Sequence, residues 1–187
     1  MDASSIISAL SAALPALDIE RGEAADWPTL IVPGDRLVDV ARVLRDDPSL
    51  RFDVLVEVTA VDWWPAQPRF EVVYHVVATA VPARLRLKVR VGGEAPRVPS
   101  VHTVWMSADW LEREVWDLFG IVFEQHGDLR RLLMPEDWSG HPLRKDYPVQ
   151  IAMTPKVYEP LQLSEQQFRA NIAADRDARG GSNRTGR

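Results

Sequence analysis

Residues 84–91 read Arg84-Leu85-Arg86-Leu87-Lys88-Val89-Arg90-Val91, a strict alternation of basic and apolar side chains. Successive side chains of a β-strand point to opposite faces, so the pattern predicts a strand with one apolar and one basic face. The segment 51–62 has Phe52, Val54, Val56 and Val58 in alternation, and 70–79 is rich in Val and Tyr. Short Pro-containing connections separate the three segments, which indicates an antiparallel meander with one face in water.

Apolar residues at helical spacing predict helices over 4–14, 36–45 and 107–119. Gly120 stands where a glycine commonly ends a helix. Residues 29–32 predict one more short strand. Together these elements predict an α+β fold with an antiparallel or mixed β-sheet and packed helices, followed by an extended C-terminal arm.

The periodicity fades after Phe123, and proline recurs through a long stretch from Pro135 to Pro160. A structureless segment of this length is uncommon in a compact domain unless it has a function. We therefore expect an α/β core domain over 1–125, an extended partner-docking segment over 126–169, and a polar, flexible tail over 170–187.

Composition narrows the function classes. The net charge of −5 argues against a general nucleic-acid binder, and seven Trp residues suit a protein that makes interfaces. The chain has no Cys, so it can form no disulfide and hold no Cys-ligated iron–sulfur cluster. No apolar run reaches the ~18–20 residues that span a bilayer, and Asp2 does not suit a signal peptide, so we expect membrane association only through a partner.

The stretch 112–148 mixes charges of both signs with Trp, Phe, Leu and Pro. A solvated loop does not need the aromatic residues, and a core does not tolerate unpaired charges, so the stretch is predicted to dock against another protein. The residues expected at that interface are Glu112, Arg113, Glu114, Asp117, His126, Arg130, Arg131, Trp138, His141, Arg144, Lys145, Asp146 and Tyr147.

Three other interpretations stay open on the residues alone. Glu114, Asp117, His126 and His141 could form the metal or acid–base site of a self-standing enzyme, and Asp128 and Asp146 could add ligands. The charges of the helix could instead form a buried or interfacial ion-pair network, which its aromatic neighbours favour, or a plain solvated face. The basic face of residues 84–90 could bind RNA or anionic lipid, although Lys and Arg on a sheet more often face solvent.

Two blocks of this stretch carry a resemblance to a known family. Residues 112–121 read Glu-Arg-Glu-Val-Trp-Asp-Leu-Phe-Gly-Ile, and residues 140–148 read Gly-His-Pro-Leu-Arg-Lys-Asp-Tyr-Pro. They resemble the 30 kDa-type subunit, known in bacteria as the C subunit, of respiratory NADH:quinone oxidoreductase (complex I). The sequence departs from the family at 125–127, where Gln-His-Gly stands in place of the usual Gly-His-Pro.

The resemblance implies a non-catalytic subunit of the peripheral arm, held by other subunits on the cytoplasmic face of the inner membrane. It implies packing against the 49 kDa-type subunit (the D subunit in bacteria) and iron–sulfur subunits, with the membrane arm contacted only indirectly and no nucleic acid bound. No cofactor is expected on this chain, whereas the complex carries iron–sulfur clusters, FMN and quinone. Related subunits occur in membrane-bound hydrogenases and in complexes fed by ferredoxin or coenzyme F420, which remain alternatives.

Overall fold

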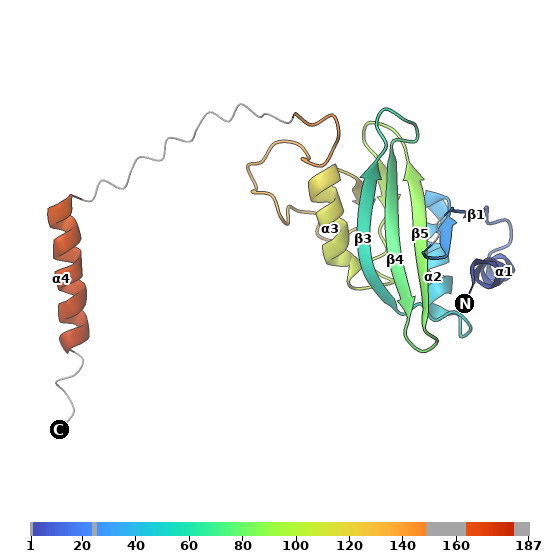
Figure 1. Cartoon of the computed structure of the whole chain (residues 1–187), viewed down its shortest axis with the longest axis horizontal. Helices are drawn as coiled ribbons and strands as arrows, with labels where there is room; N and C mark the ends of the chain where they lie inside the picture. Colours follow the sequence, from blue (N-terminus) through green and yellow to red (C-terminus); the bar gives the residue numbers. More distant parts are fainter. Residues whose placement is uncertain (1, 24–25, 149–163, 182–187) are drawn as a thin grey trace, which may run out of the picture. The chain divides into compact units, whose positions relative to one another are not determined.

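The alternating segments form the middle and one edge of a five-stranded sheet with strand order β1-β2-β5-β4-β3 (Figure 1). β3 (Val54–Asp62), β4 (Phe70–Ala78) and β5 (Ala83–Val91) are antiparallel neighbours. β2 (Thr29–Ile31) runs parallel to β5, and β1 (Glu20–Arg21) pairs antiparallel with β2. The predicted α+β fold with a mixed sheet is therefore confirmed.

This computed structural model describes residues 2–23, 26–148 and 164–181. They belong to two units, Met1–Pro148 and Val149–Arg187, and each unit is described by itself. The first unit continues past residue 125, where the sequence places the end of the core domain. The interval 149–163 of the predicted docking segment and residues 182–187 of the predicted tail lie outside the described residues.

Helices and a small second sheet surround the five strands. α1 (Ala3–Ala13) contacts α2 (Leu37–Asp46), which follows the 3-10 turn η1 (Gly34–Arg36). α3 (Ala108–Phe119) lies beside β3 (Figure 1). β6 (Arg97–Pro99) and β7 (Val122–Glu124) form a two-stranded parallel sheet from the segments before and after α3.

One face of the large sheet carries the hydrophobic core. Tyr74 and Leu87 of the central strands are fully buried, together with Leu44 of α2 and Leu10 of α1. Each fully buried side chain of this size stabilises the fold by about 1.5–3 kcal/mol. The helices pack on this face because the alternation of side chains along the strands gathers the apolar residues there.

The opposite face of the sheet carries paired charges. Lys88 donates to Glu71 at 2.7 Å, Arg86 contacts Asp26 at 3.0 Å, and Arg90 contacts Glu20 at 2.7 Å. Arg84 stacks over the ring of Trp27, 5.2 Å from its centroid. Three of the four basic residues of β5 are therefore paired with acidic residues from other strands and loops, and the fourth, Arg84, lies over an indole ring. This pairing removes the main support for an RNA or lipid surface.

β3 departs from simple alternation. The register with β4 shifts between Leu55 and Glu57, as in a β-bulge. Val54 and Val56 are consequently exposed while Leu55 and Val58 are buried, although the sequence places Val54, Val56 and Val58 in one row. One extra residue in a strand moves all following side chains to the other face, which explains the difference.

The second unit contains α4 (Glu165–Gly181). The sequence predicts an extended segment up to residue 169 and a flexible tail after it, so this helix differs from the prediction. Ser164 and Gln167 each accept a hydrogen bond from the backbone N–H of the other, which is a capping box, and Glu165 pairs with Arg169 one turn later at 2.7 Å. None of the helices in the described ranges is both long and apolar enough to cross a membrane.

Candidate partner-docking site

The site is built around α3 and the segment that follows β7, residues 126–148, which we call the strap. α3 ends at Gly120, which has a φ of +70°. A Cβ at this position would overlap the ring of His141 and lie 2.7 Å from Arg144 Nη2. Glycine is therefore required here both by the left-handed backbone and by the close approach of the strap.

The charged side of α3 is buried beneath the strap and the neighbouring loop. Glu112 and Asp117 are fully buried, and Arg113 is nearly so. The sequence places these residues away from the apolar stripe of the helix, which predicts exposure for an isolated helix. Burial is possible because each of these polar groups finds hydrogen-bond partners in the segments that cover it.

Asp117 is the central anchor of the strap. Its Oδ2 accepts hydrogen bonds from the backbone N–H groups of Leu132, Leu133 and Met134 at 2.8–3.0 Å, and its Oδ1 accepts one from Arg131 at 2.7 Å. Burial raises the pKa of this carboxyl, but the three N–H groups and Arg131 outweigh burial and lower the pKa to about 2. The carboxylate is therefore ionised and holds the strap by charge-assisted bonds.

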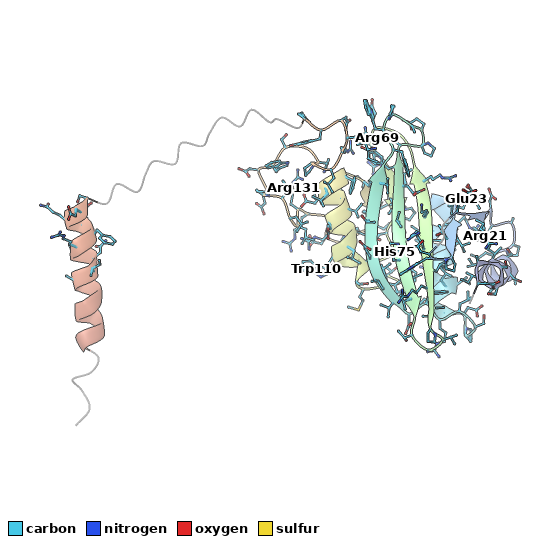
Figure 2. All side chains as sticks on the ribbon, in the orientation of Figure 1. Arg21, Glu23, Arg69, His75, Trp110 and Arg131 are labelled. Carbon is cyan, nitrogen blue, oxygen red and sulfur yellow. The ribbon has the colours of Figure 1, made fainter. Side chains whose placement is uncertain are left out.

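Arg131 lies beside α3 (Figure 2), and its contacts link three parts of the site. Besides Asp117, its guanidinium donates to the backbone oxygens of Trp138 at 2.7 Å and Gly140 at 3.1 Å. It also lies over the ring of Trp116, 5.7 Å from the centroid. The planar group with its five N–H donors is suited to this task, which a lysine could not perform.

The strap also satisfies the free carbonyl groups at the end of α3. His141 Nδ1 lies 2.9 Å from the backbone carbonyl oxygen of Asp117, and the N–H of Leu143 donates to the backbone oxygen of Leu118 at 3.0 Å. Arg144 donates to the oxygens of Phe119 at 2.5 Å and Gly120 at 3.2 Å. The last carbonyls of a helix have no partner within it and favour a positive charge nearby, so Arg144 acts as a C-terminal cap.

A second anchor ties the strap to the end of the β3–β4 hairpin. Arg69 donates to both oxygens of Asp62 at 2.8 and 2.9 Å and to both oxygens of Asp146 at 2.6 and 3.0 Å. The N–H of Lys145 also donates to Asp62, at 2.9 Å. Burial raises the pKa of Asp62, but these donors outweigh it and lower the pKa to about 2. Figure 2 shows Arg69 near the turn that joins the two strands.

Asp62 and Arg69 are absent from the residues that the sequence predicts for this site. A signal was present, because Asp62 ends one predicted strand and Arg69 precedes the next. Antiparallel neighbours joined by a short turn bring such positions side by side. The partner at residue 146, however, is 77 positions from Arg69 and leaves no local pattern.

The first turn of the strap is held by Arg113 and His126. Arg113 donates to the oxygens of Arg130 at 3.3 Å and Arg131 at 3.2 Å and lies over the ring of Trp110. His126 Nε2 lies 3.0 Å from the backbone carbonyl oxygen of Asp109. These contacts attach the strap along the whole length of α3.

The remaining predicted residues lie on or near the surface. Arg130 is exposed and pairs with Asp128, and Glu114 is half-buried. Tyr147 donates to the oxygen of Ser139 at 2.8 Å. The indole Nε1 of Trp138 is buried and has no hydrogen-bond partner among the described residues. Lys145, Leu133 and Leu143 of the strap are exposed.

The structure does not assemble the metal site that the sequence left open. His126 and His141 are engaged with backbone groups of α3, and Asp146 is engaged with Arg69. Within the described ranges, no group of three or more His, Asp or Glu side chains is placed to hold a metal ion.

The chain matches a family model described as "Respiratory-chain NADH dehydrogenase, 30 Kd subunit" over residues 30–152. It is 46% identical over 149 residues to the NADH-quinone oxidoreductase C subunit of Roseiflexus sp. (strain RS-1), covering 80% of this chain and 86% of that protein. It is 41% identical over 165 residues to the corresponding C subunit of Rhodopseudomonas palustris (strain TIE-1), covering 84% and 80%.

Solved structures show the same relationship. A trypsin-resistant fragment of Nqo5 shares 32% identity with a TM-score of 0.55, covering 69% of this chain and all of the fragment. A chain of the membrane-bound sulfane sulfur reductase, an archaeal respiratory membrane complex, shares 25% identity with a TM-score of 0.61, covering 87% and 95%. The strap and its anchors lie inside the matched region, and the chain belongs to the family of the 30 kDa subunit of respiratory-chain NADH dehydrogenase.

Proposed function

We propose that this chain is a non-catalytic structural subunit of the peripheral arm of NADH:quinone oxidoreductase. The complex transfers electrons from NADH through FMN and iron–sulfur clusters to quinone, coupled to proton translocation. The chain holds the quinone-site subunit and the cluster-bearing subunits in fixed positions. It lies on the cytoplasmic face of the inner membrane, held there by the 49 kDa-type subunit and iron–sulfur subunits.

The observation that carries the proposal is the fixation of the strap. Asp117 and Arg69 anchor it at two places, and the backbone and side-chain contacts of Arg131 and Arg144 define its course. Such a segment presents a preformed surface, and a preformed surface loses little conformational entropy when a partner binds. This is the property expected of a scaffold that sets distances between redox subunits.

The strap also changes which residues are proposed to face the partner. Polar contacts between α3 and the strap engage Arg113, Asp117, Arg131 and Arg144, so these residues shape the surface. Glu112 is buried against Val101 and takes no part in those contacts. The outward side chains of Arg130, Leu133, Leu143 and Lys145 are proposed to meet the 49 kDa-type subunit. Exposed apolar and charged side chains on one segment supply both kinds of contact that protein interfaces use.

A second candidate is a homologous subunit of a different respiratory membrane complex, such as one fed by ferredoxin or coenzyme F420 or a membrane-bound hydrogenase. The similarity to a chain of the membrane-bound sulfane sulfur reductase favours it. The two candidates assign the same task to the strap and differ in the module that supplies electrons.

Affinity purification of the tagged full-length chain from its native membranes, in mild detergent, tests both. We expect mass spectrometry to identify a large quinone-site subunit and Cys-rich iron–sulfur subunits. Subunits with NADH and FMN sites would support the first candidate, and a different input module would support the second. Recovery of the chain alone would contradict the scaffold proposal.

A further inference from the structure

Glu112 stands apart from the anchors of the strap because it is buried without a cation. Its Oε1 accepts a hydrogen bond from the N–H of Val101 at 2.8 Å, and its Oε2 contacts the hydroxyl of Ser100. Among the described residues no Lys or Arg forms an ion pair with it. A buried carboxylate without a counter-charge is unfavourable, and such a group binds a proton instead.

Among the described residues, the basic group that lies beside Glu112 is the side chain of His126, whose Nε2 is 4.0 Å from Oε2. The contacts of that imidazole direct its N–H away from Glu112. Its Nδ1 accepts a hydrogen bond from the backbone N–H of Asp128 at 3.1 Å. Its Nε2 therefore carries the hydrogen and donates to the backbone oxygen of Asp109 at 3.0 Å. Asp109 Oδ1 also lies 3.5 Å from Nε2, so the N–H of His126 serves Asp109 and makes no hydrogen bond to Glu112.

Asp109 and Tyr74 also lie within electrostatic reach of Glu112. Asp109, one turn earlier on α3, adds negative charge. The hydroxyl of Tyr74, from β4, is fully buried and has no hydrogen-bond partner among the described residues. Burial raises the pKa of Glu112 to about 7, with the Asp109 charge adding to the effect and the Ser100 and Val101 hydrogen bonds opposing it.

A hydrogen-bonded chain leads from this carboxyl group toward the surface. The hydroxyl of Ser100 lies 2.8 Å from His102 Nδ1 and accepts the N–H of His102 at 3.2 Å. His102 is only half-buried. The chain thus runs from the Glu112 carboxyl through the Ser100 hydroxyl to an imidazole with access to water.

The hydrogen bonds of this chain are complete in two protonation states. With Glu112 protonated, its O–H donates to Ser100, and the Ser100 O–H donates to His102 Nδ1. With Glu112 ionised, the Ser100 O–H donates to the carboxylate, and a proton on His102 Nδ1 donates to Ser100. The states differ by one proton passed from Glu112 to Ser100 and one from Ser100 to His102, after which His102 Nε2 releases a proton to water.

We propose that Glu112 is a proton-binding site of this chain, and that its proton exchanges with water through Ser100 and His102. This site is independent of the proposed docking function, because none of the three residues is an anchor of the strap. The ligand is the proton itself. The folded chain takes it up at neutral pH, where an exposed glutamate would be ionised.

Infrared spectroscopy of the full-length chain tests the binding site, since a protonated carboxyl group absorbs apart from an ionised one. Between about pH 5.5 and about pH 8.5, exposed carboxyl groups stay ionised, and we expect one carboxyl band with a midpoint near neutrality. Glu112→Gln, which keeps the shape and can donate to Ser100, should lack the band. Glu114→Gln, on the same helix, should keep it. A missing band in the wild type, or a band that persists in Glu112→Gln, would overturn the site.

A pH jump followed by the same band tests the path. We expect the band to respond at least about tenfold more slowly in Ser100→Ala and in His102→Phe than in the wild type, because each change interrupts the chain. His75→Phe, on the outer face of the sheet, is the control and should respond at the wild-type rate. Wild-type rates in both Ser100→Ala and His102→Phe would refute the path while leaving the binding site in place.

Discussion

At the scale of single residues, Asp117 shows how one buried carboxylate organises a segment that has no regular secondary structure. Replacing it with Asn keeps the shape and removes the charge that Arg131 and three N–H groups share. Removing one partner of a buried ion pair leaves the other uncompensated, so we expect Asp117→Asn to lower the free energy of unfolding by about 3 kcal/mol, measured by urea titration.

Two comparisons make this prediction specific. Asp39→Asn removes an exposed partner of Arg36, 3.5 Å away, and should change stability by less than about 0.5 kcal/mol. The pKa of Asp117 is lowered from 3.8 to about 2, so its contribution is present above pH 3.8 and disappears as the pH falls through about 2. Equal stability of Asp117→Asn and wild type at neutral pH would refute the anchor.

Glu112 predicts the opposite pH dependence. Its pKa is raised from 4.5 to about 7, so the folded chain binds a proton that the unfolded chain releases. Its contribution is therefore fully present below pH 4.5 and is lost as the pH rises to about 7, in total on the order of 3 kcal/mol. The stability of Glu112→Gln relative to the wild type should therefore rise by about 3 kcal/mol between about pH 4 and about pH 8. Parallel stability curves for the two proteins would contradict the prediction.

His141 also titrates in the pH range over which the Glu112 contribution changes, because burial lowers the pKa of this imidazole. A histidine of this kind favours folding above its ordinary value of 6.5 and loses that contribution as the pH falls, which opposes the Glu112 slope. The difference between wild type and Glu112→Gln cancels the His141 contribution, because both proteins contain it. The prediction is therefore made for the difference curve.

At the scale of elements, the junction of α3 and the strap depends on Gly120. Ala at a φ of +70° costs about 1–2 kcal/mol for the backbone alone. Gly93→Ala is a matched control, because Gly93 has a φ of +88° and nothing within 4 Å of an added Cβ. Gly120→Ala should be at least about 1 kcal/mol more destabilising than Gly93→Ala, since it also displaces His141 and Arg144.

Hydrogen exchange locates the effect of that substitution. The N–H of Leu143, which donates to Leu118, should lose protection in Gly120→Ala and keep it in Gly93→Ala. Unchanged protection in both variants would show that the strap tolerates a side chain at the end of α3.

The second anchor is tested by limited proteolysis. Arg69→Gln removes the cation between Asp62 and Asp146, so the 141–147 part of the strap should open more often. Trypsin cleavage after Arg144 or Lys145 should rise about tenfold, which corresponds to a loss of about 1.4 kcal/mol in local stability. Arg90→Gln, which breaks the exposed pair with Glu20, should leave the cleavage rate unchanged. Equal rates in the two variants would argue against the anchor.

The elements also show what can be read from the sequence. Strands β4 and β5 and helix α3 are predicted nearly to their ends, because their period and their terminal Gly120 are local signals. The bulge in β3 is not predicted, since nothing local distinguishes it from continued alternation. The capping box that begins at Ser164 is a local signal, yet the polar composition after it favoured a flexible tail.

Part of the candidate site can likewise be predicted from the sequence, and part of it cannot. The residue types around Asp117 and Arg144 predict an ion-pair segment, and the structure brings them together on α3. The sequence predicts a buried or interfacial network for the helix charges and assigns Arg131 and Arg144 to a partner. The structure shows that Asp117, Arg131 and Arg144 bind within the chain. Pairings such as Arg69 with Asp146 depend on which surfaces fold together, and only tertiary structure reveals them.

At the scale of the whole molecule, the chain uses much of its charge internally. The outer face of the sheet pairs Lys88 with Glu71 and Arg90 with Glu20, and the strap pairs Arg131 with Asp117. Internal pairing limits non-specific attraction to nucleic acid or anionic lipid. For a partner there remain the shape of the strap, its exposed leucines and a few exposed charges such as Lys145.

Assembly provides the last prediction. Leu143 on the strap and Val81 in the β4–β5 turn are similarly exposed, at 51% and 53%, and neither contributes to the core. An aspartate at either position should leave the isolated chain folded, because an exposed site away from caps and pairs tolerates substitution. If the strap meets the 49 kDa-type subunit, Leu143→Asp buries an unpaired charge there and should lower recovery of the complex at least about tenfold. Val81→Asp should assemble normally in the same affinity purification. Equal recovery of the two variants would move the interface away from the strap and leave its anchors with a purely structural role within this chain.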